Sequence, residues 1–380
     1  LNIVVRNIVV RNIVVRNIQE VNMIVNNIRD IDFGILQEFA NDVRVTDMVV
    51  SESGRVWVDC GQGLKERATR VPLNNPALLR EYAVWLCAQL GKRLDDACPI
   101  ADASSTSGIR IHAVLAPLVS QGAALSIRFP SINRYDLVSL SDQGMFPKEL
   151  SCILSVLVKK RANIMITGST GSGKTTLMKA LLAAADCEDR IVSVEEIREL
   201  GELTQNHVSL SAREANVEGV GEIGLSQLVK ATLRMRPDRI ILGECRGEEI
   251  ADLLRVFTSG HKGGMTTLHA DEIEKVPARL MALGLLAGLE PAALCALAAG
   301  AFDVVIHVER SSNGRRMIKE LGILQYASSA SLLCGVPVLQ LSCGIDGSIV
   351  MKFLPAWVKF SNYWNLPENM ASVCVDSSNN

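Results

Sequence analysis

Residues 163–185 read NIMITGSTGSGKTTLMKALLAAA, and this stretch decides the fold of the chain. Its first five residues are a short apolar run typical of a buried strand, and residues 176–185 have the Ala and Leu content of a helix. The loop between them, GSTGSGKT at 168–175, matches the pattern GxxxxGK followed by Ser or Thr at every fixed position. A strand, a glycine-rich loop and a helix in this order predict a site for a polyphosphate.

The chemistry of this loop fits ATP and Mg²⁺. Glycines let successive backbone N–H groups point at phosphate oxygens, and the helix that starts near Lys174 adds the positive end of its dipole. Lys174 is expected to neutralise the β- and γ-phosphates, and Thr175 to hold Mg²⁺ through its hydroxyl. The predicted nucleotide-binding residues are Gly168, Ser169, Thr170, Gly171, Ser172, Gly173, Lys174, Thr175 and Thr176. A flexible Gly/Ser loop without a ligand is the alternative.

Strand-like and helical segments alternate from Lys148 onward, which predicts an α/β domain. The expected helix after the first one is 226–235, and further strands are expected at 190–195, 207–211, 239–244, 265–270 and 302–309. Such alternation implies a mostly parallel sheet covered on both faces. Ligands bind beyond the carboxyl ends of the strands in these sheets, so polar residues that directly follow a strand are the candidates for catalysis.

Three glutamates stand at predicted strand ends. Glu244 closes RIILGE (239–244) and is placed to orient or deprotonate an attacking water, while Gly243 stands where many P-loop proteins carry a Mg²⁺-binding Asp. Glu195 and Glu196 close another strand, and the carboxylate of Glu196 would complete the water shell of the metal. A solvated acid without a catalytic role is the alternative for each.

Two histidines, His261 and His269, flank the run GGMTTL. His269 closes the predicted strand MTTLH, where a neutral imidazole would be placed to sense a phosphate through a hydrogen bond. A purely structural role is the alternative for a single histidine in such a position.

A smaller α/β domain is predicted before the phosphate-binding domain. Residues 43–59 alternate apolar and polar side chains around Ser53-Gly54, which indicates a hairpin. A helical pattern follows at 76–94, and two further strands are expected at 109–118 and 123–129.

The chain is expected to have five segments. Residues 2–16 repeat NIVVR three times with a period that suits neither helix nor strand, and no function is assigned to this leader. The expected organisation is a leader at 1–31, an N-terminal α/β domain at 32–130, a linker at 131–147, an ATPase domain at 148–327 and an unassigned tail at 328–380.

Composition limits the class of protein. The chain has 380 residues with 39 Lys+Arg, 41 Asp+Glu and 48% hydrophobic residues, which excludes wholesale disorder and the strong basic excess of a nucleic-acid coat protein. Ten scattered cysteines include no CxxC pair, so no zinc site is expected. Two apolar stretches, 281–302 and 321–345, are interrupted by charged, polar or proline residues, and no integral membrane span is predicted.

The motifs together resemble the type II/IV secretion and pilus-assembly ATPases, most closely the Tad/Flp-type branch. VEEIREL (194–200) is similar to the acidic box of this family with Glu196 in place of its usual Asp, and REANVEGVGE (213–222) is similar to the segment that follows it. RMRPDRIILGECRGEE (234–249) resembles the Walker B region with its flank at Arg246, and GHKGGMTTLHAD (260–271) resembles the His box. The likeness spans about residues 32–327.

This resemblance implies a RecA-like ATPase in a homohexameric ring, with ATP bound between two domains. By position, Arg110 and Arg128 of the N-terminal domain match the family arginines that reach the phosphates. The expected partner is an inner-membrane platform protein, and the expected location is the cytoplasm, peripheral to the inner face of the cell membrane. No specific nucleic acid is expected.

Two other functions stay open. A RecA-like sheet also drives nucleic-acid motors, although the near-neutral charge and the His box speak against this reading. An ATP-binding ring scaffold without turnover is the other alternative, and Gly243 in place of an Asp is the feature in its favour.

Overall fold

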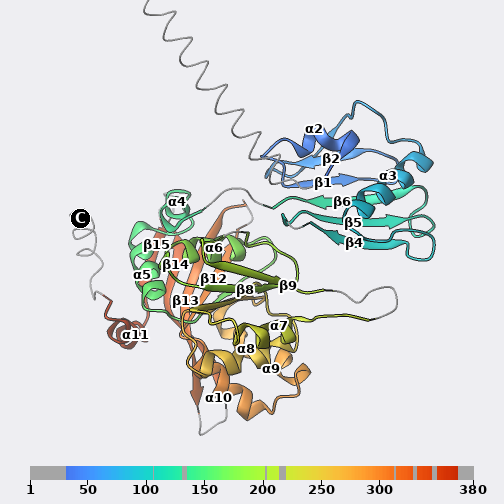
Figure 1. Cartoon of the computed structure of the whole chain (residues 1–380). Helices are drawn as coiled ribbons and strands as arrows, with labels where there is room; N and C mark the ends of the chain where they lie inside the picture. The colour runs from blue at the N-terminus through green and yellow to red at the C-terminus, as the bar shows by residue number, and fades with distance from the viewer. Residues whose placement is uncertain are drawn as a thin grey trace, which may run out of the picture. The chain divides into compact units, whose positions relative to one another are not determined.

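A computed structural model describes residues 31–366 except 106, 131–134, 202, 214–219, 312–313, 328–331 and 345–348. The NIVVR repeat therefore lies outside the described residues, as does most of the 213–222 segment. The chain divides into two compact units, Leu1–Asn133 and Arg134–Asn380, and each is described by itself (Figure 1).

The first unit is a six-stranded antiparallel sheet in the order β3-β2-β1-β6-β5-β4. Its core contains alternate strand residues together with the buried side of the long helix α3, which starts at an Asn75 cap followed by Pro76. The hairpin expected at 43–59 is present as β1 and β2. The elements are η1 Gly34–Leu36, α2 Gln37–Ala40, β1 Asp47–Val50, β2 Val56–Asp59, β3 Leu64–Arg67, α3 Pro76–Gln89, β4 Ile100–Ser104, β5 Arg110–Leu115 and β6 Ala123–Arg128.

The second unit is built on a nine-stranded sheet in the order β15-β14-β13-β12-β7-β11-β10-β8-β9. The six strands from β12 to β9 are parallel to their neighbours, as the alternating pattern predicts, and β13, β14 and β15 extend the sheet antiparallel. The strands are β7 Ile164–Thr167, β8 Ile191–Glu195, β9 His207–Ser211, β10 Arg239–Leu242, β11 Met265–Leu268, β12 Val304–Arg310, β13 Arg316–Ala327, β14 Leu332–Cys343 and β15 Ile349–Phe353.

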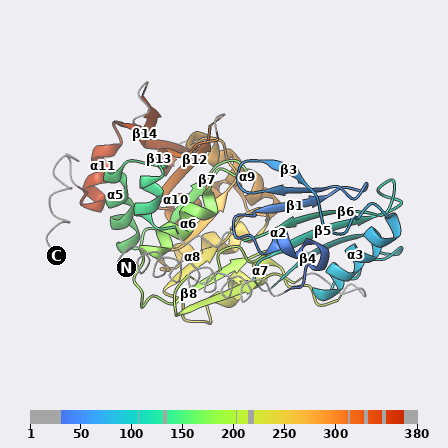
Figure 2. The ribbon, with the colours of Figure 1, turned by 90° about the horizontal axis from the view of Figure 1, so that it is seen from above.

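Helices cover both faces of this sheet (Figures 1 and 2). The core on one face includes residues of α4, α5, α6 and α11, and the core on the other face includes residues of α8, α9 and α10. The central strand β7 is buried throughout and alternates between the two cores, with Ile164 and Ile166 in the first and Met165 in the second. The helices are α4 Leu137–Asp142, α5 Lys148–Lys159, α6 Lys174–Ala183, α7 Leu225–Thr232, α8 Glu249–Thr258, η2 Ile273–Lys275, α9 Val276–Leu286, α10 Pro291–Ala301 and α11 Trp357–Trp364.

Two stretches carry more structure than their composition indicates. Helix α4 lies inside the stretch expected to be a linker, where Asp136 caps it and Leu137 and Leu140 are buried in the core of the second unit. Strands β14 and β15 and helix α11 lie inside the expected tail and belong to the same unit. The apolar stretch 321–345 contributes to the β13–β14 pair, and no helix in the described part of the chain is long and apolar enough to cross a membrane.

Candidate active site

The glycine-rich loop joins β7 to α6 at the carboxyl edge of the parallel strands. Gly168 and Gly173 have φ angles of 148° and 101°, which are positive values that side chains disfavour. A Cβ on Gly168 would lie 2.2 Å from the carbonyl oxygen of Val308, and one on Gly173 would lie 3.2 Å from Cδ of Arg316. Backbone conformation therefore favours glycine at both positions, and close packing against the Val308 carbonyl also requires it at Gly168.

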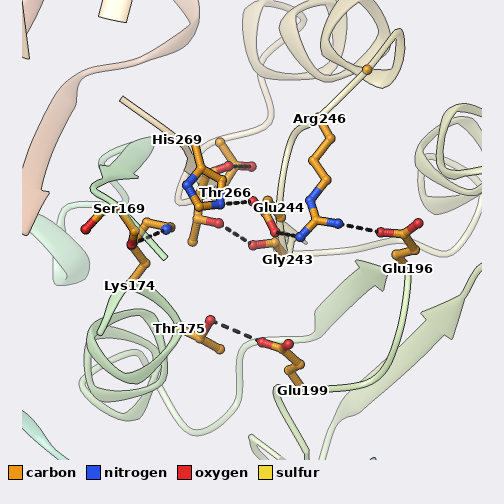
Figure 3. A network of polar contacts seen from close by, with 12 residues as sticks. Ser169, Lys174, Thr175, Glu196, Glu199, Gly243, Glu244, Arg246, Thr266 and His269 are labelled. Carbon is orange, nitrogen blue, oxygen red and sulfur yellow. Dashed lines mark hydrogen bonds and ion pairs between the residues drawn. The ribbon is translucent and has the colours of Figure 1, made fainter. Parts of the chain in front are cut away.

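Lys174 points back into the loop from the first turn of α6 (Figure 3). Its Nζ donates hydrogen bonds to the carbonyl oxygens of Gly168 (2.8 Å) and Ser169 (2.9 Å). Burial lowers the pKa of Lys174, and the nearby carboxylate of Glu244 opposes this shift. The ammonium group is thus held where a phosphate bound to the loop would meet it.

A chain of polar side chains links the ends of three strands (Figure 3). Nε2 of His269, just after β11, lies 2.6 Å from Oε1 of Glu244, just after β10. The other oxygen of Glu244 lies 2.7 Å from Nη2 of Arg246, and Nη1 of Arg246 lies 3.2 Å from Glu196, just after β8. Four of the predicted catalytic residues are therefore neighbours, although they are up to 73 positions apart in the sequence.

The surroundings of His269 favour its neutral form. Burial and the positive charge of Lys174 lower its pKa, while Glu244 has the opposite effect. The strong hydrogen bond to Glu244 raises the pKa of the Arg246 guanidinium, which stays charged. Glu244 consequently lies between a neutral imidazole and a cationic guanidinium.

Residues 29–319 match the family described as type II/IV secretion system protein. The chain belongs to this family. A Mycobacterium tuberculosis (strain H37Rv) protein named for conjugal transfer is 41% identical over 300 residues, which are 77% of this chain and 85% of that relative. VirB11, a type IV secretion system protein of Brucella suis, is 31% identical over 274 residues, which are 64% of this chain and 74% of the relative.

Solved structures of similar fold include an ATPase and a pilus retraction motor. The ATPase DotB of Legionella pneumophila aligns with a TM-score of 0.51 at 18% identity, over 78% of this chain and 81% of DotB. The pilus retraction motor PilT, solved with bound ADP, aligns with a TM-score of 0.55 at 18% identity, over 77% and 82% of the two chains. The likeness confirms the expected α/β fold, in which a RecA-like domain follows a smaller N-terminal domain.

Glu195 is the buried glutamate of VEEIREL (194–200), the segment that is similar to the acidic box of the family. Its side chain is in the interior, where Oε1 accepts hydrogen bonds from the backbone N–H groups of Glu199 (2.8 Å) and Leu200 (3.0 Å). Burial raises the pKa of Glu195. A Cβ on Gly243 would lie 3.0 Å from Cγ of Glu195, so Glu195 fills the space that an Asp side chain at 243 would need.

Sequence reasoning missed Glu199, the third glutamate of VEEIREL. Its Oε2 accepts a hydrogen bond of 3.3 Å from the hydroxyl of Thr175 (Figure 3). Glu199 follows a strand end by four residues, and the turn closed by Glu195 brings it back to the glycine-rich loop. The signal available in the sequence was the run of three acids after one strand, of which only the first two were chosen.

The oxygen atoms around Thr175 suit a magnesium ion. A hydroxyl with a carboxylate beside it offers the hard donors that Mg²⁺ prefers, and this ion usually takes its remaining ligands from phosphates and water. Within the described ranges no three His, Cys, Asp or Glu side chains are grouped to hold a metal by themselves. The residues therefore fit an ion shared with a nucleotide.

The other predicted residues lie in the first unit, in the glycine-rich loop and in α6. Arg110 and Arg128 face each other across β5 and β6 in the first unit, and Nε of Arg128 donates to Asp47 (2.9 Å). Their reach to a nucleotide stays a prediction, since they and the loop belong to different units. Within the loop, Ser169 and Thr170 are exposed and Ser172 is buried, while Gly171 is exposed and Thr176 is half-buried in α6.

Proposed function

We propose that this chain hydrolyses ATP with Mg²⁺ as a homohexameric motor that powers pilus assembly of the Tad/Flp kind or type II/IV secretion. The observation that carries the proposal is the 2.6 Å approach of His269 to Glu244 beside Lys174 and the glycine-rich loop. A phosphate-binding loop alone serves binding, whereas a carboxylate held between an imidazole and a guanidinium beside that loop serves hydrolysis.

Each side chain has a role in this proposal. Lys174 leaves the carbonyls of Gly168 and Ser169 to bind the phosphates. Thr175 and Glu199 would hold the metal, which would supply charge neutralisation at the phosphates when bound. Glu244 accepts a proton from the attacking water. His269 holds Glu244 in place and is the candidate to sense the γ-phosphate when ATP is bound.

The acidic box supports turnover over a role as an inactive scaffold. Gly243 would leave the site short of an acid if nothing replaced the usual Asp. Glu195 occupies that space, and Glu196 reaches the site through Arg246. In this proposal the carboxylate of Glu196 would bind a water molecule of the metal's shell.

Ring assembly and a membrane partner extend the proposal. The relatives include proteins named for conjugal transfer and type IV secretion, and a similar fold belongs to a pilus retraction motor. In a homohexamer Arg110 and Arg128 would approach the phosphates from the N-terminal unit and release them after hydrolysis. The ring would act in the cytoplasm, on a platform protein at the inner face of the cell membrane.

Two variants of the full chain test the proposal. Lys174→Ala is expected to abolish nucleotide binding and turnover because the loop loses its phosphate-binding cation. Glu244→Gln keeps the shape of the side chain and is expected to bind ATP normally but to lose hydrolysis by about a hundredfold or more. Phosphate release and equilibrium binding of a fluorescent ATP analogue are measured on both.

Thr69→Ala is the control, since this half-buried residue lies in the first unit, where its hydroxyl donates to the backbone carbonyl of Val71. Normal phosphate release by Lys174→Ala and Glu244→Gln would overturn the assignment of the site. Turnover that rises on addition of DNA and falls with salt would instead favour a nucleic-acid motor.

A further inference from the structure

The strand β12 runs beside the glycine-rich loop and beyond the end of β7. His307 of β12 is paired with Thr167, the last residue of β7, and β12 continues for three more residues to Arg310. The partner strand β13 returns from Arg316. Because a strand rises about 3.3 Å per residue, this extension carries the ends of both strands about 10 Å along the loop.

Arg310 and Arg316 face each other at the end of this antiparallel pair. Nε of Arg316 donates a hydrogen bond of 3.1 Å to the carbonyl oxygen of Gly171, in the middle of the loop. Nη1 of Arg310 lies 3.8 Å from the point where Gly171 would carry a Cβ. Both guanidinium groups therefore border the backbone that is expected to wrap the phosphates.

The charged residues next to the arginine pair, Arg310 and Arg316, have polar partners of their own. Glu309 lies 3.5 Å from Lys319, and Arg315 donates to the carbonyl of Gly144. Neither member of the pair lies within ion-pair distance of a carboxylate among the residues that the structure describes. Like charges directly opposite each other destabilise an antiparallel pair, so an anion between them would relieve the repulsion.

The strand order places the arginine pair on a defined side of the nucleotide. Glu244 and His269 follow β10 and β11, which lie on one side of β7, whereas β12 lies on the other side. The γ-phosphate belongs beside Glu244 and His269 in the proposed mechanism. A polyphosphate laid along the loop therefore has its α-phosphate and nucleoside end toward Arg310 and Arg316.

We propose that Arg310 and Arg316 bind the α- and β-phosphates of the nucleotide, so that they hold ADP as firmly as ATP. This inference rests on the proposed ATPase function and adds two binding residues to it. A planar guanidinium with several donors suits the oxygens of two adjacent phosphates. Arg316 would exchange its bond to the Gly171 carbonyl for phosphate oxygens. Such a grip does not depend on the γ-phosphate and would slow the release of ADP.

The experiment compares ADP and ATP binding by the full chain. In Arg310→Ala/Arg316→Ala the affinities for fluorescent analogues of both nucleotides are expected to fall by the same factor, about tenfold or more. The ratio of the two affinities stays unchanged, because the lost contacts do not involve the γ-phosphate. Arg310→Lys/Arg316→Lys keeps the charge and is expected to recover part of the binding.

Lys319→Ala is the matched control, since it removes a cation from the same strand that is already paired with Glu309. Unchanged ADP affinity in the double alanine variant, with binding lost in Lys174→Ala, would overturn this inference and leave the ATPase proposal intact. Binding that survives Lys174→Ala would overturn the ATPase proposal itself.

A second variant distinguishes direct nucleotide binding from a structural effect of Arg316 on the loop. Arg310→Ala removes a side chain with no hydrogen bond to the loop, so the loop conformation and the melting temperature should not change. A loss of ADP affinity in this variant supports direct binding. Normal affinity in Arg310→Ala, with loss only in Arg316→Ala and a lowered melting temperature, would show that Arg316 merely braces the loop and would overturn the proposal.

Discussion

At residue 243 the site depends on the absence of a side chain. Gly243 directly follows β10 beside the buried Glu195, and the hydroxyl of Thr267 donates to its carbonyl oxygen (2.8 Å). These contacts hold the backbone that positions Glu244. An Asp here, though common in other P-loop proteins, would meet Glu195 at close range and add a like charge to an interior carboxylate.

Gly243→Asp is accordingly expected to destabilise the second unit by about 1–3 kcal/mol and to lower turnover. Urea denaturation and phosphate release measure the two effects. Gly300→Ala in α10 is the control, because a Cβ there would have its nearest neighbour at an ordinary 3.7 Å. Turnover equal to that of the unmodified chain in Gly243→Asp would contradict the role given to Glu195.

His269 sets the response of the enzyme to acid. Its pKa is lowered from an ordinary value of about 6.5, chiefly by burial, so the imidazole gains a proton only as the pH falls below that value. The imidazolium would pair with Glu244 and suppress its basicity. Turnover is expected to hold from pH 8 to 6.5 and to decline below this range in a pH–rate profile. The residual activity of His269→Asn should lack this decline. A decline centred above pH 6.5 in the unmodified chain would contradict the assignment of the decline to His269.

At the scale of elements, a buried ion pair connects several segments at the amino ends of the parallel strands, opposite the site. Arg239 at the start of β10 is 1% exposed and lies 2.6 Å from Asp189, which is 4% exposed. The same guanidinium donates to the carbonyl of Val158 at the end of α5. One side chain thus joins β10, α5 and the loop before β8.

Arg239→Met is expected to cost about 3–5 kcal/mol of stability, because Asp189 would remain buried without this partner. Arg161→Gln is the matched control: it also pairs with Asp189 but is 44% exposed, and its loss is expected to cost about 0–1 kcal/mol. Chemical denaturation of both variants gives the comparison. Equal losses would mean that burial does not govern the strength of this network.

At the scale of the molecule, local patterns predict the parallel half of the sheet and the loop within it. Apolar runs such as residues 164–166 and 240–242 indicate buried strands when helical segments flank them on both sides in the sequence. The antiparallel strands β13 to β15 were not predicted. Their pairing depends on backbone hydrogen bonds between neighbouring strands, and the residue pattern of one strand does not show which strand it pairs with. Likewise Glu199 reaches Thr175 only through a turn held by Glu195, which is a tertiary contact.

The family match ends at residue 319, but the hydrophobic core of the second unit continues into the C-terminal segment. Trp357 and Trp364 of α11 are 5% and 7% exposed and belong to the same core as Leu150 of α5. Trp364→Ala is expected to destabilise the second unit by about 3–5 kcal/mol through the cavity it leaves. The adjacent Tyr363 is 73% exposed, so Tyr363→Ala should change stability by less than about 0.5 kcal/mol. Thermal denaturation with and without ADP measures both, and equal melting temperatures would show that α11 is an appendage outside the ATPase core.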